Sequence, residues 1–167
     1  HIDNVVGLIP WRQRLFTCSW DITVKEWSLV SYRPVRSLTC ASSSVLRLSF
    51  SPGGEKLLYT SWADRSIYEI NTVAPYDRAF IQKHQLGPSG LLYADDGKII
   101  VSGAYDNLAL VYHKETQTQS TFDAHPACVH SFATHVSQPN LIFSGDEHDK
   151  GNEILKWTLD RREVLSS

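Results

Sequence analysis

Short runs in which apolar and polar residues alternate recur along the chain. Residues 45–50 alternate with a period of two, residues 51–56 carry the Pro and Gly residues of a turn, and residues 57–60 resume the apolar run. This order is typical of a β-hairpin with one buried face. Residues 90–102 repeat the scheme around an Asp-Asp-Gly turn. No stretch keeps an apolar period of 3.6 residues, so the pattern predicts an all-β chain.

The hairpins share a period of about 42 residues. Four kinds of position repeat: a His, a hydroxyl residue at the end of the second strand, an Asp four residues after the hydroxyl, and an aromatic or aliphatic residue six residues after the Asp. The hydroxyl residues Thr17, Thr60, Ser102 and Ser144 are 43, 42 and 42 residues apart. Such agreement indicates four copies of one structural unit. We place the copies at about 1–40, 41–83, 84–124 and 125–167.

In residues 19–27, and in lengthened form in residues 143–157, the pattern resembles the WD40 repeat family. The resemblance covers essentially the whole chain. It implies β-propeller blades, each a sheet of four antiparallel strands around a central channel. Four repeats would make an incomplete ring of about four blades. We therefore expect a fragment of a larger propeller, in which the remaining blades or a second chain close the ring.

In that family the His, hydroxyl, Asp and Trp of one repeat form a hydrogen-bonded chain inside the blade. The second repeat keeps only the hydroxyl and the Asp, because Ala41 stands at the His position and Ile70 at the Trp position. In the third repeat a Tyr replaces the Trp, and in the fourth repeat either Asp146 or Asp149 is the acid. The implied network residues are His1, Thr17, Asp21, Trp27, Thr60, Asp64, His84, Ser102, Asp106, Tyr112, His125, Ser144 and Trp157.

The same residue types could form a hydrolase triad or a metal site, and both alternatives are disfavoured. A catalytic triad occurs once in a chain, whereas this set recurs in each repeat, so we predict no enzyme activity. Cys128, His130 and His135 could chelate zinc, but they lack a partner pair at ligand spacing. Residues 146–153 resemble a calcium loop in composition only. We expect neither a metal nor a cofactor.

Composition narrows the class of partner. The chain has 167 residues and a formal net charge of -2, which gives no field to attract nucleic acid. It contains no apolar run of about 18 residues, so we predict no membrane insertion. Its three scattered cysteines, Cys18, Cys40 and Cys128, favour free thiols in the cytoplasm or nucleus.

By the resemblance, the residue before each repeated Asp faces the channel mouth on the top face of the propeller. Trp20 and Tyr105 occupy that position, and Trp62 is adjacent to it in the second repeat. Exposed aromatic side chains are frequent anchors of protein partners. Trp11, at a hairpin tip on the opposite face, is a further aromatic candidate.

These observations predict a non-catalytic scaffold that docks a protein or peptide on the top face. A substrate receptor of a cullin-type ubiquitin ligase is the alternative, but residues 157–161 lack the WDxR pattern that many such receptors carry. A phosphoinositide site is disfavoured because the one paired arginine, Arg161–Arg162, lacks the flanking Phe and Gly.

Overall fold

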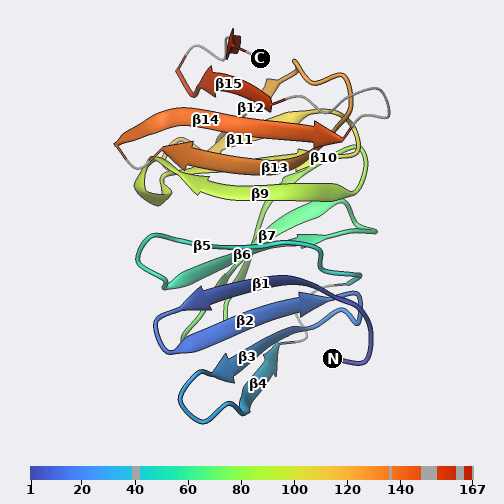
Figure 1. Ribbon diagram of the computed structural model, residues 1–167, viewed down its shortest axis with the longest axis vertical. Helices are drawn as coiled ribbons and strands as arrows, with labels where there is room; N and C mark the ends of the chain where they lie inside the picture. Colours follow the sequence, from blue (N-terminus) through green and yellow to red (C-terminus); the bar gives the residue numbers. More distant parts are fainter. Residues whose placement is uncertain (39–41, 136, 148–153, 161–163, 167) are drawn as a thin grey trace. The chain divides into compact units, whose positions relative to one another are not determined.

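The computed structural model describes residues 1–38, 42–135, 137–147, 154–160 and 164–166. The chain forms two compact units, His1–Lys83 (unit 1) and His84–Ser167 (unit 2). Each unit contains two antiparallel sheets of four strands, which we call blades, and the strands of each sheet follow chain order (Figure 1). Within the described residues the one helical element is a short 3-10 turn, η1 (Asp95–Gly97). The prediction of an all-β chain built of four-stranded blades is confirmed.

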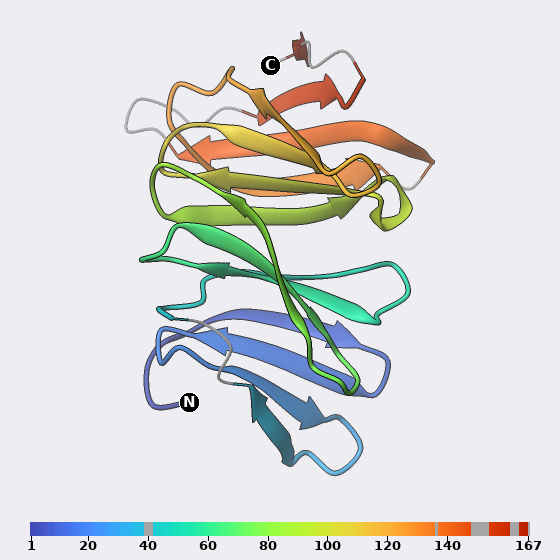
Figure 2. The same cartoon turned by 180° about the vertical axis from the view of Figure 1, so that it is seen from behind.

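Unit 1 holds blades 1 and 2. Blade 1 consists of β1 (Val5–Trp11), β2 (Arg14–Ser19), β3 (Val24–Ser28) and β4 (Pro34–Leu38). Blade 2 consists of β5 (Leu48–Phe50), β6 (Lys56–Ser61), β7 (Ser66–Asn71) and β8 (Arg78–Lys83). Seen from behind in Figure 2, the outer strand β8 (green) lies toward the viewer.

A single apolar core joins the two sheets of unit 1. It brings Phe16 and Val24 of blade 1 against Val45, Leu57 and Tyr59 around blade 2. All five are fully or almost fully buried, and each such side chain contributes about 1.5–3 kcal/mol relative to exposure. Blades 1 and 2 therefore fold as one unit because neither sheet covers its apolar face alone.

Unit 2 repeats this arrangement. Blade 3 consists of β9 (Pro88–Ala94), β10 (Ile99–Ala104), β11 (Ala109–His113) and β12 (Thr118–Phe122). Blade 4 consists of β13 (Cys128–His135), β14 (Gln138–Glu147), β15 (Ile154–Thr158) and β16 (Val164–Ser166). Their shared core includes the fully buried Trp157, whose ring stacks on Phe122 with centroids 4.2 Å apart and planes 12° from parallel.

Strand β5 is shorter than the apolar alternation indicates, since it begins at Leu48 rather than at residue 45. The backbone amides of Leu46 and Arg47 donate to the Thr60 hydroxyl oxygen, at 3.1 and 3.0 Å. The Val45 amide donates instead to the carbonyl of Ser19 in blade 1. Side-chain and inter-blade bonds thus replace the regular ladder, although Val45 itself stays in the core.

Two glycines of blade 3, Gly90 and Gly103, allow blade 4 to approach closely. A Cβ atom at Gly103 would lie 2.5 Å from the carbonyl oxygen of Val129 and 2.9 Å from the ring of Phe132. At Gly90 it would lie 2.7 Å from the same ring. Phe132 can therefore pack against blade 3 only because both positions lack a side chain.

We expect Gly103→Ala to lower the free energy of unfolding by about 1–3 kcal/mol, because backbone atoms of β13 would have to move. Chemical denaturation followed by tryptophan fluorescence measures the change. Gly53→Ala is the matched control, since a Cβ there meets only the Glu55 Cγ at 3.9 Å. Equal stability of the two variants would contradict the close approach of blades 3 and 4.

Candidate functional site

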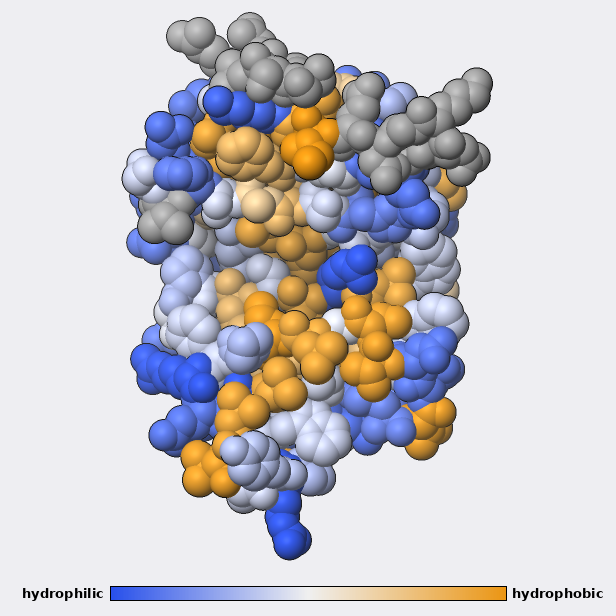
Figure 3. Space-filling model, in the orientation of Figure 1, coloured by the Kyte–Doolittle hydropathy of each residue, from blue (hydrophilic) through white to orange (hydrophobic). Residues whose placement is uncertain are grey.

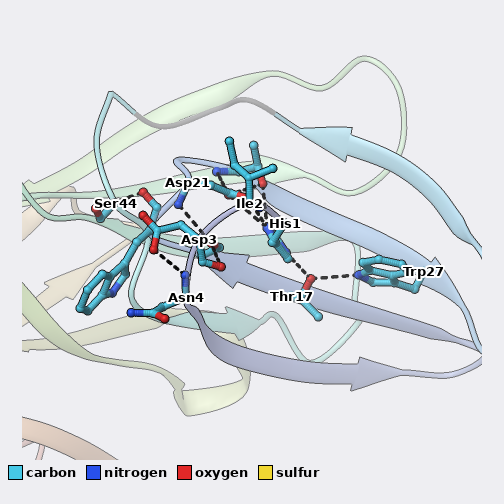
Figure 4. Close-up of polar contacts among 11 residues, drawn as sticks. His1, Ile2, Asp3, Asn4, Thr17, Asp21, Trp27 and Ser44 are labelled. Atoms are coloured by element: carbon cyan, nitrogen blue, oxygen red, sulfur yellow. Dashed lines mark hydrogen bonds and ion pairs between the residues drawn. The ribbon is translucent and has the colours of Figure 1, made fainter.

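Blade 1 contains a complete hydrogen-bonded chain of four side chains. His1 Nδ1 lies 2.9 Å from an Asp21 carboxylate oxygen, and His1 Nε2 lies 2.7 Å from the Thr17 hydroxyl. The Trp27 indole N–H donates to the same hydroxyl over 2.9 Å. Figure 4 shows His1 between Asp21 and Thr17, with Trp27 on the far side of Thr17.

The donors and acceptors favour one tautomer of the His1 ring. An indole N–H can only donate, so the Thr17 hydroxyl accepts from Trp27 and keeps its own hydrogen to offer to Nε2. In the tautomer that uses this hydrogen, Nδ1 carries the ring hydrogen and donates it to the Asp21 carboxylate. Every member of this buried chain is satisfied by the others, which is the arrangement that stabilises a polar group inside a blade.

Asp21 also ties the surrounding backbone together. It accepts from the amides of Ile2 and Thr23, at 2.9 and 3.1 Å. Burial alone would raise the pKa of this carboxyl, but the hydrogen bonds from Thr23 and Ile2 outweigh it and hold the pKa below its ordinary value. The acid is therefore ionised and structural.

Blades 3 and 4 build the same arrangement. In blade 3 the His84 ring lies 3.1 Å from Asp106 and 2.7 Å from the Ser102 hydroxyl. Tyr112, which we expected in the place of the tryptophan, is partly buried on β11, and its hydroxyl contributes no bond to this chain among the described residues.

In blade 4 the His125 ring lies 3.1 Å from Asp146 and 2.6 Å from the Ser144 hydroxyl. The Trp157 indole N–H donates to Ser144 over 2.9 Å, as Trp27 does to its hydroxyl in blade 1. Of the two acids that the sequence left open, Asp146 contacts the histidine. Asp149 lies outside the described residues.

Blade 2 bonds its acid through different residues. One carboxylate oxygen of Asp64, Oδ2, accepts from the Ser42 hydroxyl at 2.8 Å and from the Tyr68 hydroxyl at 3.0 Å, whereas Oδ1 is buried and has no hydrogen-bond partner among the described residues. Burial would raise the Asp64 pKa, but hydrogen bonds from Ser42, Ser61 and Tyr68 hold it below the ordinary value. Sequence reasoning missed Ser42 and Tyr68. The available signal was a tyrosine four residues after the Asp, where the other repeats have Lys25 and Leu110.

The burial of these networks decides whether their hydroxyl groups can act as nucleophiles. The hydroxyl oxygens belong to Thr17, Thr60, Ser102 and Ser144, which are all buried, and those of blades 1 and 4 already accept an indole N–H. A serine nucleophile needs an open path to a substrate carbonyl. The His–Ser–Asp sets of this chain are therefore structural.

The aromatic residues predicted on the top face are partly exposed. In unit 1 Trp20 and Trp62 lie on either side of Ser44, which donates its hydroxyl to the Trp20 carbonyl at 3.3 Å and accepts the Trp62 amide at 3.0 Å. Their exposed fractions are 46% and 37%. We call this pair with Ser44 the tryptophan edge. No pattern in the sequence indicates this role of Ser44.

In unit 2 Tyr105 is 43% exposed and meets the His130 ring edge to face, with centroids 5.2 Å apart. His130 Nε2 in turn lies 2.7 Å from a Glu147 carboxylate oxygen. This contact places His130 on the surface with Tyr105 and away from Cys128, which is buried beside Ser89.

In the described part of the chain, no three His, Cys, Asp or Glu side chains are grouped closely enough to hold a metal ion. Burial raises the pKa of the Cys128 thiol to about 11, so it stays protonated and unreactive. Cys18 and Cys128 are buried and form no disulfide within the described residues. Cys40, Ala41 at the His position of the second repeat, and the Arg161–Arg162 pair lie outside the described residues.

Four-stranded antiparallel sheets that pair through an apolar core and each bury an acid-centred network are blades of a β-propeller. Comparisons with known proteins agree with this class. No protein-family model matches the chain. It is 23% identical over 146 residues to the target of rapamycin complex subunit wat1 of Schizosaccharomyces pombe, covering 87% of this chain and 45% of that protein. It is 26% identical over 120 residues to human WD repeat-containing protein 90, covering 69% of this chain and 7% of that protein.

Solved structures show the same fold. U3-55K superimposes with a TM-score of 0.87 at 17% identity, over 99% of this chain and 52% of that one. A chain of the mitotic checkpoint complex gives 0.84 at 20% identity, over 96% and 49%. The chain is thus similar in sequence to WD repeat proteins and has the blade fold of their propellers, and it spans about half, or less, of the length of these relatives.

We expect Ser144→Ala to cost about 2 kcal/mol of stability, because it leaves the buried His125 Nε2 and Trp157 N–H without their shared partner. Thermal and chemical denaturation measure the loss. The control is Tyr112→Phe, which removes a hydroxyl at the position of blade 3 that corresponds to Trp157 and should change stability by less than about 0.5 kcal/mol. A neutral Ser144→Ala would show that the chain of bonds in blade 4 is not stabilising.

Acid should weaken the fold through the networked carboxyls. Burial opposes ionisation of Asp106, but the hydrogen bond and charge of His84 hold the Asp106 pKa below the ordinary 3.8. A carboxyl with a lowered folded-state pKa contributes its full stability above the unfolded value and loses it as the pH falls through the folded value. We therefore expect the free energy of unfolding to fall below about pH 4.

The slope of stability against pH should be smaller in Asp106→Asn than in the wild-type chain, because the titrating group is gone. Asp123→Asn, which alters an exposed acid beside the same blade, is the control and should keep the wild-type slope. Denaturation curves at a series of acidic pH values give both slopes. Equal slopes for all three proteins would contradict the prediction that protonation of Asp106 lowers stability in acid.

Proposed function

We propose that the chain is part of a non-catalytic scaffold that docks a protein or peptide partner, and that the tryptophan edge of unit 1 is a contact surface. The observation that carries the proposal is the pair Trp20 and Trp62, partly exposed on adjacent blades and joined through Ser44. Tryptophan is enriched among the residues that contribute most to protein interfaces.

The edge is rigid, which favours binding. The Trp20 amide donates to the Asn4 carbonyl at 3.1 Å, and the next residue is the networked Asp21. Trp62 is held by Ser44 and lies two residues before Asp64. Side chains carried on a fixed backbone lose little conformational entropy on association, so more of the contact energy appears as affinity.

Unit 2 offers a second, more polar surface of the same kind. Tyr105, His130 and Glu147 lie together at the ends of β10, β13 and β14, where Tyr105 and Glu147 are exposed and His130 is partly buried. An aromatic ring beside a close His–Glu pair suits the rim of an interface.

The curated relatives support a role in assembly. The fission yeast relative is named as a subunit of a target of rapamycin complex, and the human relative is named for its WD repeats. The comparisons give no support to the ubiquitin-ligase substrate receptor. No helix among the described residues is long and apolar enough to span a membrane.

We also infer that further blades or a second chain complete the propeller. Figure 3 shows apolar side chains gathered over the strands β1 and β5 of unit 1, and Leu8 of β1 is 64% exposed. The matched propeller chains are about twice as long as the part that this chain covers. In a closed propeller, apolar side chains that one blade leaves exposed are normally buried by a neighbouring blade.

We expect the double variant Trp20→Ala with Trp62→Ala to lose at least one partner that the wild-type chain captures, while its melting behaviour stays close to wild type because both side chains lie at the surface. Affinity capture followed by quantitative mass spectrometry compares the two proteins. Tyr32→Asn is the control, since it removes an exposed aromatic on the opposite edge at a left-handed position that Asn tolerates. Capture of every partner at wild-type yield by the double variant would overturn this assignment.

A further inference from the structure

A groove crosses the edge of unit 1 opposite the tryptophan edge, between blades 1 and 2. Its inner part is a cavity of about 240 Å³ between the β1–β2 hairpin, the β5–β6 hairpin and the start of the β7–β8 loop. Its outer part, of about 300 Å³, lies between β4 and the β7–β8 loop. Arg14, Thr72 and Val73 line both parts, so the two hollows adjoin, and we call them together the groove.

The inner part is walled by aromatic rings. The Trp11 ring lies 5.5 Å from that of Phe50, and Phe50 meets Phe16 edge to face at 5.0 Å. Trp11 therefore packs against the neighbouring blade, with one side left to line the cavity.

Two glycines shape the wall opposite. A Cβ at Gly54 would overlap the Trp11 ring, and the φ angle of +72° at this position favours glycine as well. At Gly53 a Cβ would meet only the Glu55 side chain, at 3.9 Å, so this wall borders open space. The cavity can thus receive an apolar side chain beside Trp11.

Arginines give the groove a positive charge. Glu26 is 2% exposed and forms ion pairs with Arg14, at 3.0 Å, and with Arg36. Two cations around one buried carboxylate leave one positive charge uncompensated, and half of the Arg14 side chain faces solvent. Arg12 lies over the Trp11 ring, 5.9 Å from its centroid, and adds a second cation against the single further acid, Glu55.

The outer part presents apolar surface beside these charges. Val35 and Val73 are both more than half exposed, and the Arg36 guanidinium lies 4.3 Å from the centroid of the partly exposed Tyr76 ring. Apolar and cationic groups therefore alternate along the groove. The complementary ligand alternates apolar side chains with carboxylates.

We propose that this groove binds an acidic peptide segment of a protein partner, with an apolar side chain of the peptide in the cavity beside Trp11 and its carboxylates on Arg12 and Arg14. Arginine pairs well with carboxylates because its planar fork can donate two hydrogen bonds. A nucleic acid fits less well, since the lining carries Glu26 and Glu55 and too few cations to follow a phosphate backbone. The site is separate from the tryptophan edge and goes beyond the docking surface proposed there.

The test measures binding of a fluorescein-labelled peptide of mixed Asp, Glu, Leu and Phe residues by fluorescence anisotropy. We expect saturable binding to the full chain that weakens with added salt. Arg12→Glu should weaken binding about tenfold or more by reversing a charge at the groove. Gly53→Leu should abolish it by filling the cavity without changing any charge.

Two matched variants distinguish an effect at the groove from an effect of net charge or of substitution at Gly53 in general. Lys83→Glu makes the same charge reversal at the far end of β8, and Gly53→Ala adds only a methyl group, so both should bind like wild type. The variant Trp20→Ala with Trp62→Ala should also bind normally, which keeps this result independent of the tryptophan edge. Circular dichroism confirms that each variant is folded.

Three results would overturn the proposal. They are an absence of saturable binding to the wild-type chain, equal binding of a peptide in which Lys replaces Asp and Glu, and unchanged binding by folded Gly53→Leu. Tighter binding of a single-stranded oligonucleotide than of the peptide, lost in Arg12→Glu, would instead assign the groove to nucleic acid.

Discussion

A buried carboxylate at the turn between the second and third strands holds each blade of this chain together. In blade 1 Asp21 accepts from the backbone amides of Ile2 and Thr23 and from the His1 ring, so one side chain joins the segment before β1 to the turn after β2. These loop donors lack partners in the strand ladder and would otherwise be unsatisfied. The Thr17 hydroxyl forms hydrogen bonds with both the His1 ring and the Trp27 indole, so the network also includes β3.

Blade 2 shows that the buried acid, and not the histidine, is the residue that a blade requires. Asp64 Oδ2 accepts from Ser42 and from Tyr68, which reaches it from the following strand. The freed hydroxyl of Thr60 bonds the backbone amides of Leu46 and Arg47 and shortens β5. A repeat can thus lose two of its four characteristic residues and keep its fold, provided that other hydroxyl groups take over the hydrogen bonds.

The two edges of unit 1 differ in chemistry although the same blades form both. At one edge Trp20 and Trp62 are fixed through Ser44 and offer aromatic surface with little charge. At the opposite edge the arginines around Glu26 and the rings around Trp11 offer an apolar cavity beside positive charge. One rigid scaffold could hold two different segments of partner at once, since neither edge uses a residue of the other. Simultaneous binding of this kind raises overall avidity without any new contact.

The sequence by itself determined the strands, the repeat and most of the buried networks, because period-two alternation and a spacing of about 42 residues are local or regular signals. It placed His84 with Ser102 and His125 with Ser144, since these residues recur at fixed positions in the repeat. It did not determine that Ser42 and Tyr68 bond Asp64 or that Asp146 contacts His125 in blade 4. Nor did it determine that, among the described residues, the Tyr112 hydroxyl makes no bond to the network of blade 3. Those outcomes depend on which hydroxyl or carboxylate reaches a buried partner once the sheets have packed. Only the tertiary structure decided the groove as well, because Trp11, Arg14 and Val73 come from separate strands and loops and share a surface only where two blades meet.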